Sequence, residues 1–257
     1  MRIFLITDIH YGEDTNYEKF GGLEYVNSFG SQFNSFLPSL LPKMKEADVV
    51  INLGDLIRDV DADNDEIHYK EARDLFKDIE GIKHVVGNHD IKYLGREKMA
   101  KLINEKKTYY SFDRAGYHHI VLDGNADVFK GPIYFSDEQL EWLKEDLAKT
   151  KLSTIVYSHF PLDNQNLEKN YYFANSPYPV FPKGSDAVRS LLEESNKVIA
   201  VFSGHLHFFS NQNISGIEYV TVPAFTENDG SHAPKAEYVL ATVENNNFSF
   251  EVIKCEA

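Results

Sequence analysis

The sequence predicts an α/β fold, and two patterns support this prediction. Short runs rich in β-branched residues recur along the chain, and helical patterns separate most of them. Such alternation is typical of parallel strands joined by helices. After Gly216 consecutive strands follow, which we expect to form an antiparallel addition to a second sheet. The strands expected in the alternating part are 2–7, 48–53, 82–86, 117–122, 154–158 and 197–203.

Residues 136–149 have the clearest helical pattern. Ser136 and Gln139 have the spacing of a capping box, and several leucines with Trp142 make an apolar face, so we interpret Trp142 as a core residue. Further helices are expected at 31–45, 65–79, 96–105 and 185–194. The final strands are expected at 217–222, 238–243 and 248–253, with an Asn-rich turn at 245–247.

Composition favours one domain in a reducing compartment. A chain of 257 residues with 42% hydrophobic residues can bury a large core, and no linker divides it, so we expect a single domain over 1–257. A lone cysteine, Cys255, excludes an internal disulfide framework and fits the cytoplasm. No stretch of sequence is long and apolar enough for a membrane span. The formal charge of -14 argues against nucleic acid as a partner and favours a small anionic substrate.

A long loop rich in Asn, Pro and aromatic residues is expected at about 163–184, as an insertion in this domain. Tyr171, Tyr172, Phe173 and Tyr178 have two interpretations. They stack on a nucleobase, or they pack the loop onto the body of the protein. Packing is favoured, because buried aromatic residues ordinarily belong to a core. Tyr171 and Tyr172 remain candidates for substrate binding.

Chemistry-bearing residues follow five of the expected strands. Because the carboxyl ends of parallel strands lie along one edge of a sheet, we expect these groups to converge in one site. Taken singly, each motif could be a turn or a cap. The motifs are Asp8-Ile9-His10, Gly54-Asp55, Gly87-Asn88-His89-Asp90, Ser158-His159 and Gly204-His205-Leu206-His207.

These side chains offer carboxylate, amide and imidazole ligands without sulfur. Manganese, iron, zinc, nickel and cobalt all accept such ligands, and the number of candidates suits two ions better than one. In Asp-x-His and His-x-His, alternate residues of an extended segment point the same way, so each motif could present two ligands to one pocket. Glycines before Asp55, Asn88 and His205 would let the chain turn close to the ions.

The ordered motifs DIH, GDLIRD, GNHD, SH and GHLH resemble those of the calcineurin-like metallophosphoesterase superfamily, and most of all its cyclic-nucleotide phosphodiesterase type. This resemblance implies a four-layer αββα sandwich of two mixed β-sheets flanked by helices. It also implies that Asp55 bridges two metal ions. The other implied ligands are Asp8, His10 and His207 for one ion and Asn88, His159 and His205 for the other.

The resemblance further implies that His89 contacts the phosphate or the leaving group, together with Asn88, and we expect Asp90 to orient His89. Two divalent or mixed-valence ions (Mn, Fe, Zn or Ni) would outweigh the charge of Asp8 and Asp55 and attract a phosphate. A hydroxide bridging the ions would attack phosphorus, and His89 as imidazolium would protonate or stabilise the leaving oxygen.

We therefore expect a metal-dependent phosphoesterase acting on a small organic phosphate, with a phosphodiester such as a cyclic nucleotide ahead of a monoester. The alternatives are a phosphomonoesterase or nucleotidase, a nuclease, which the acidic charge disfavours, and a non-catalytic metal-binding scaffold. Arg58 has two equally weighted interpretations, as a phosphate-binding residue or as a solvated one beside Asp59 and Asp61. Because some relatives place their arginine one position later, at Asp59 here, their phosphate-binding role is not transferred.

Overall fold

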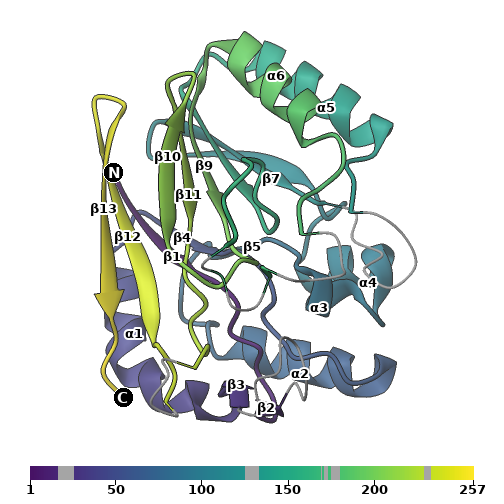
Figure 1. Cartoon of the computed structure of the whole chain (residues 1–257), viewed down its shortest axis with the longest axis vertical. Helices are drawn as coiled ribbons and strands as arrows, with labels where there is room; N and C mark the ends of the chain where they lie inside the picture. The colour runs from purple at the N-terminus through teal and green to yellow at the C-terminus, as the bar shows by residue number, and fades with distance from the viewer. Residues whose placement is uncertain (17–25, 125–132, 169, 171–172, 175–179, 229–232) are drawn as a thin grey trace.

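Two β-sheets lie face to face in the computed structural model, with helices on both outer sides (Figure 1). The structure describes residues 1–16, 26–124, 133–168, 170, 173–174, 180–228 and 233–257. The first sheet has the order β13 (Asn247–Lys254), β12 (Glu237–Glu244), β1 (Arg2–Ile6), β4 (Val49–Asn52) and β5 (Lys83–His84). The second has the order β10 (Ser210–Ile214), β11 (Ile217–Thr221), β9 (Val198–Ser203), β8 (Thr154–Ser158), β7 (Tyr117–Leu122) and β6 (Tyr110–Arg114).

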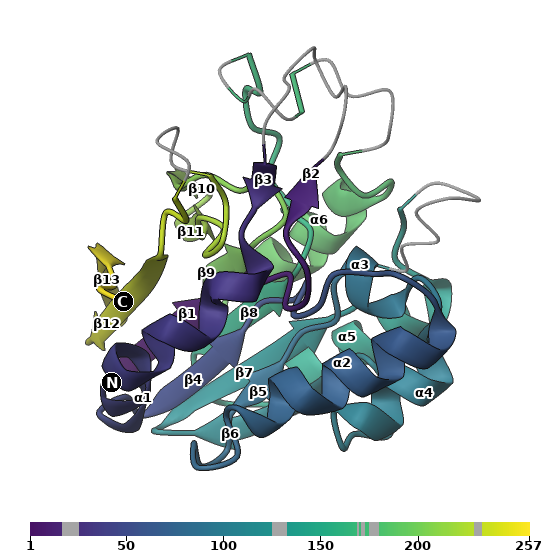
Figure 2. The ribbon, with the colours of Figure 1, turned by 90° about the horizontal axis from the view of Figure 1, so that it is seen from below.

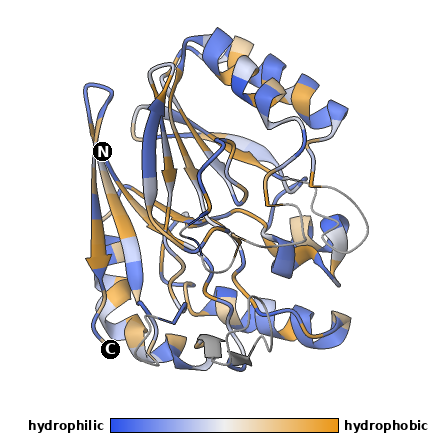
Figure 3. Cartoon of the chain, viewed as in Figure 1, coloured by the Kyte–Doolittle hydropathy of each residue, from blue (hydrophilic) through white to orange (hydrophobic). Residues whose placement is uncertain are grey.

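Alternation along single strands produces the layers. In β1, Ile3 and Leu5 belong to the core between the sheets, whereas Phe4 and Ile6 belong to the core beneath the helices of the first sheet. The outward core of the second sheet lies under α5 (Asp137–Lys149) and α6 (Ser185–Ser195). Hydropathy colouring agrees with these layers, because the central strands are largely orange whereas β10, at the edge of the second sheet, is blue and the helices carry both colours (Figure 3). The predicted four-layer sandwich of two mixed sheets is confirmed.

The helices of the first sheet come from the segments between its strands. A 3-10 turn at Gly30–Phe36 leads into α1 (Leu37–Lys45), and α2 (Ala62–Asp74) begins at Asp61, whose carboxylate accepts two backbone N–H bonds. Figure 2 shows α1 and α2 against this sheet. The short α3 (Asn88–Ile91), α4 (Gly95–Leu102) and the ribbon of β2 (Thr15–Asn16) with β3 (Val26–Ser28) complete the described elements.

The expected antiparallel addition to the second sheet is wrong in its location. β12 pairs antiparallel with β1 in the first sheet, and β13 extends that sheet, whereas β11 pairs parallel with β9. The reason is burial, because Val239 and Ala241 of β12 complete the core between the sheets beside Ile3 and Leu5. No helix in the described parts of the chain is long and apolar enough to cross a membrane.

Candidate dinuclear metal centre

The motifs meet where the parallel strands of both sheets end. β1, β4 and β5 run parallel in the first sheet, and β8 and β9 run parallel in the second. Asp8, Asp55 and Asn88 follow strands of the first sheet, whereas His159 and the pair His205 and His207 follow strands of the second. The site therefore lies across the seam between the two sheets.

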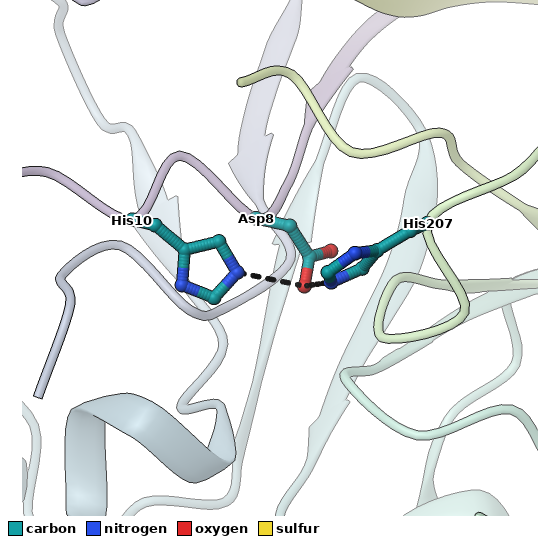
Figure 4. Close-up of side chains that lie close together, drawn as sticks. All are labelled: Asp8, His10 and His207. Carbon is teal, nitrogen blue, oxygen red and sulfur yellow. Dashed lines mark ion pairs between the residues drawn. The ribbon is translucent and has the colours of Figure 1, made fainter. Parts of the chain in front are cut away.

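Asp8, His10 and His207 form one group of possible metal ligands (Figure 4). Asp8 Oδ1 lies 3.1 Å from His207 Nε2 and 3.8 Å from His10 Nε2. Asp8 Oδ2 is held in place because it accepts hydrogen bonds from Thr7 Oγ1 at 2.6 Å and from the His205 N–H at 3.1 Å. One carboxylate oxygen is thus anchored, and the other faces two imidazole nitrogens.

Asp55, His159 and His205 form a second group, and Asn88 lies beside it. His159 Nε2 is 3.2 Å from Asp55 Oδ2 and 3.2 Å from Asn88 Oδ1. His159 Nδ1 lies 2.9 Å from the carbonyl oxygen of Leu53, an acceptor that places the ring proton on Nδ1 and leaves Nε2 to face the site. Asp55 also belongs to a group with His10 and His89, so it lies between the two halves of the site.

The backbone of the Asp-x-His and His-x-His motifs differs from the expected extended conformation. All four candidate ligands in these motifs have positive φ: +51° at Asp8, +47° at His10, +66° at His205 and +63° at His207. Residues other than glycine rarely adopt this conformation, and it must be held by its surroundings. The Asp8 N–H donates to the Gly54 carbonyl and the His10 N–H to the Asp55 carbonyl, both at 3.0 Å.

The glycines beside the ligands serve mainly to leave space. A Cβ at Gly87 would overlap Asp55 Oδ1, and a Cβ at Gly204 would overlap Thr7 Oγ1 and lie 2.8 Å from Asp8 Oδ2. Only Gly54, with a φ of +105°, also needs the conformational freedom that glycine provides.

The donor set fits divalent metal ions. Within each of the groups Asp8/His10/His207 and Asp55/His159/His205, the candidate ligand atoms lie within 4.8 Å of one another. Asp8 Oδ1 and His205 Nε2 are buried without a hydrogen-bond partner among the described residues, an arrangement that a metal ion satisfies. Burial and the nearby His89 lower the pKa of His10 to about 3, and burial holds the pKa of His205 well below its ordinary value. Both rings are therefore neutral at pH 7, as metal ligation requires.

His89 is oriented by Asp59. Its Nδ1 contacts the Asp59 carboxylate, which also binds Lys92, and its Nε2 lies 3.9 Å from Asp55 Oδ2. Burial lowers the pKa of His89, but Asp55 and Asp59 outweigh this effect and raise it. These carboxylates thus favour the protonated form of His89, and its Nε2 faces Asp55.

The prediction that Asp90 orients His89 is wrong. The Asp90 carboxylate accepts backbone N–H bonds from Leu56 at 2.9 Å, Ile57 at 3.2 Å and Gly87 at 2.9 Å. By accepting these three bonds, the Asp90 carboxylate links the backbone after Asp55 to the turn that carries Asn88, and so stabilises the site.

The remaining candidates for substrate binding are Arg58, Tyr171 and Tyr172. Arg58 Nη1 donates to the carbonyl oxygens of Glu13 and Asp14, so its guanidinium is tied to residues 13–14. Tyr171 and Tyr172 lie outside the described residues. Within the same loop, Asn170 Nδ2 donates to the Leu206 carbonyl at 2.8 Å, and the Phe173 ring lies 4.9 Å from the His205 ring.

Sequence reasoning missed two residues of the site, Asp59 and Glu227. Glu227 is 1% exposed, and its Oε2 lies 2.7 Å from His207 Nδ1. Burial raises the pKa of Glu227 to about 8. Asp59 entered the sequence analysis only as a neighbour of Arg58, and nothing in the sequence around Glu227 indicated its contact with His207.

Comparison with known proteins gives consistent results. Residues 1–209 match the family model described as calcineurin-like phosphoesterase. A 3',5'-cyclic adenosine monophosphate phosphodiesterase of Haemophilus influenzae is 26% identical over 230 residues, which cover 87% of this chain and 76% of that protein. A probable cyclic nucleotide phosphodiesterase of Fibrobacter succinogenes is 26% identical over 214 residues, covering 80% and 73% respectively. The solved structure of a dimetal phosphatase from Danio rerio superposes with a TM-score of 0.70 at 17% identity, covering 98% of this chain and 95% of that one.

Proposed function

The chain belongs to the calcineurin-like phosphoesterase family and is a metal-dependent phosphoric ester hydrolase, and we propose that its substrate is a small phosphodiester such as a cyclic nucleotide. The observation that carries the proposal is the pair of ligand groups meeting at Asp55. The two cyclic nucleotide phosphodiesterase relatives, one of them a probable one, each match at least 80% of this chain and support a diester over a monoester.

We propose that Asp8, His10 and His207 hold one ion, that Asn88, His159 and His205 hold the other, and that Asp55 lies between both. When bound, two such cations supply positive charge to the phosphoryl oxygens and lower the pKa of water. Manganese, iron, zinc and nickel all suit these oxygen and nitrogen ligands. The buried, anchored carboxylates of Asp8 and Asp55 keep the ligand atoms preorganised.

His89 is proposed to act on the leaving group. Asp59 fixes one ring nitrogen, and the other faces the site with its proton, so His89 can donate that proton to the departing oxygen. If His89→Asn turns over a poor-leaving-group diester at the wild-type rate, this role is excluded.

The proposal extends to organisation and location. We propose one domain over 1–257 with the 163–184 segment inserted in it. We also propose cytoplasmic location, which the single, buried Cys255 supports.

The test is hydrolysis by metal-stripped protein that is re-supplied separately with manganese, iron, zinc or nickel. The substrates are bis-p-nitrophenyl phosphate, p-nitrophenyl phosphate and cyclic AMP. We expect metal-restored diester hydrolysis that falls at least about a hundredfold in Asp55→Asn, because the shared ligand is lost. Asp78→Asn, an exposed aspartate after α2, is the matched control.

Each outcome selects one function. A higher rate on p-nitrophenyl phosphate than on both diesters would replace the phosphodiesterase by a phosphomonoesterase. Bound metal without turnover of any substrate would favour the non-catalytic scaffold.

A further inference from the structure

Glu227 is a buried carboxylate to which the proposed reaction assigns no part. Its Oε2 lies 2.7 Å from Nδ1 of His207, while Nε2 of the same ring lies 3.1 Å from Asp8 Oδ1. The His207 ring therefore lies between Glu227 on one side and Asp8, a candidate metal ligand, on the other.

The segment that carries Glu227 is hydrogen-bonded to the residues on either side of Asp8. The Phe225 N–H donates to the Thr7 carbonyl at 3.0 Å, and Thr226 Oγ1 donates to the Ile9 carbonyl at 2.9 Å. The Lys235 N–H donates to the Glu227 carbonyl at 2.7 Å. These bonds fix the backbone around Glu227 relative to the segment after β1 that carries Asp8.

The second ligand group has a different support. There His159 Nδ1 lies against a backbone carbonyl, that of Leu53. Removing the Glu227 side chain therefore takes away the partner of His207 in one ligand group and leaves the partner of His159 in the other intact.

We propose that Glu227 is a positioning residue of the Asp8–His10–His207 metal site alone; the inference rests on the dinuclear centre of the proposed function. Its Oε2 accepts the Nδ1–H of His207, which places the ring proton on Nδ1 and leaves the Nε2 lone pair for the ion. The bond needs an acceptor oxygen at this position, and a glutamine amide oxygen supplies one as well.

The test compares Glu227→Met, which keeps the side-chain length and removes the acceptor, with Glu227→Gln, which keeps the acceptor. Mn²⁺ binding to metal-stripped protein is measured by calorimetry, without substrate. We expect Glu227→Met to weaken one of two sites by about 10- to 100-fold, the range found for lost partners of metal-ligating histidines, with the other site unchanged. Glu227→Gln should stay within about threefold of wild type on both sites. Glu244→Met, at the exposed end of β12, is the matched control.

A second measurement reads the His207 tautomer directly. Long-range ¹H–¹⁵N spectra of the Zn²⁺-loaded protein should show the His207 proton on Nδ1 in wild type and in Glu227→Gln, and a changed signal in Glu227→Met. If the Met variant fails to fold, a His207 proton absent from Nδ1 in the Gln variant overturns the proposal.

Three binding results also overturn it: unchanged affinities in folded Glu227→Met, equal weakening of both sites, or a Gln variant as weak as the Met variant. Because binding is measured without turnover, a protein that binds two ions and hydrolyses no ester refutes the proposed function and leaves the role of Glu227 supported.

Discussion

The carboxylate of Asp59 contacts Nδ1 of His89, and this contact turns Nε2 of the same ring toward Asp55 at 3.9 Å. We expect Asp59→Asn to lower kcat by about 10- to 100-fold on a diester with a poor leaving group, because the ring loses its orienting charge. The loss on bis-p-nitrophenyl phosphate, whose leaving group needs no proton, should be less than about threefold. Equal losses on the two substrates in steady-state assays would instead assign Asp59 to the support of the metal ligands.

Gly204 lies against the two residues that begin the site. We expect Gly204→Ala to lower the metal affinity and to lower the free energy of unfolding by about 1–3 kcal/mol. The new Cβ would overlap Thr7 Oγ1 and crowd Asp8 Oδ2. Metal content and urea unfolding measure the two effects. Gly216→Ala is the control, since its φ of +82° makes the substitution strained but no atom lies within 4 Å of the new Cβ. A metal-replete Gly204→Ala would show that the strand ends can shift without harm.

His118, in β7, joins two carboxylates far from the metal ligands. Its Nδ1 lies 2.6 Å from Asp113 and its Nε2 lies 2.8 Å from Asp146. Burial lowers the pKa of His118, but the bonds to Asp146 and Asp113 outweigh burial and raise it. A raised pKa in the folded state means that the protonated ring stabilises the fold fully below about pH 6.5 and that this contribution is lost as the pH rises through the folded-state pKa.

His118→Gln should therefore reduce the free energy of unfolding more at pH 5.5 than at pH 8.5, by on the order of 1 kcal/mol, a discounted value because Asp113 is exposed. Urea unfolding of both proteins across this range measures the difference. A difference that is constant with pH would mean that the ring contributes through packing and neutral hydrogen bonds.

Phe173 separates the two interpretations of the aromatic loop. Its ring lies 4.9 Å from His205 and 6.2 Å from His207, and its N–H donates to the side chain of Asn170 at 3.0 Å. If the ring packs over the histidines, Phe173→Leu should keep KM for cyclic AMP within about twofold, and Phe173→Ala should raise it about 2- to 10-fold. If both variants raise KM alike for cyclic AMP but not for bis-p-nitrophenyl phosphate, a nucleobase stacks on this ring.

The sequence predicted those parts of the fold in which burial imposes a pattern. The expected strands 117–122 and 154–158 coincide with β7 and β8, which are buried along almost their whole length. By contrast, β10 was not expected, because an edge strand with the sequence SNQNI has no apolar alternation. The sheet to which β12 belongs depends on packing against β1 across most of the chain, which local sequence does not encode.

In the candidate site, too, local sequence patterns were predictive and long-range contacts were not. The motif residues that follow buried strands were predicted, and the structure brings them together. The contacts of Asp59 with His89 and of Glu227 with His207 connect residues 30 and 20 positions apart, through side chains whose direction depends on the turns. Positive φ at Asp8 and His10 was also invisible, since neither residue type requires it.

The seam between the sheets gives the ligand set a second consequence. Asp8 and His207 follow strands of different sheets and are far apart in the sequence, so the ion that we propose they share would tie most of the polypeptide into one closed loop. Such an ion would cross-link the chain as a disulfide does, but a chelator would remove it. The rise in melting temperature when each metal is added to metal-stripped protein should then rank the candidate metals by how strongly they stabilise the fold, before any substrate is known.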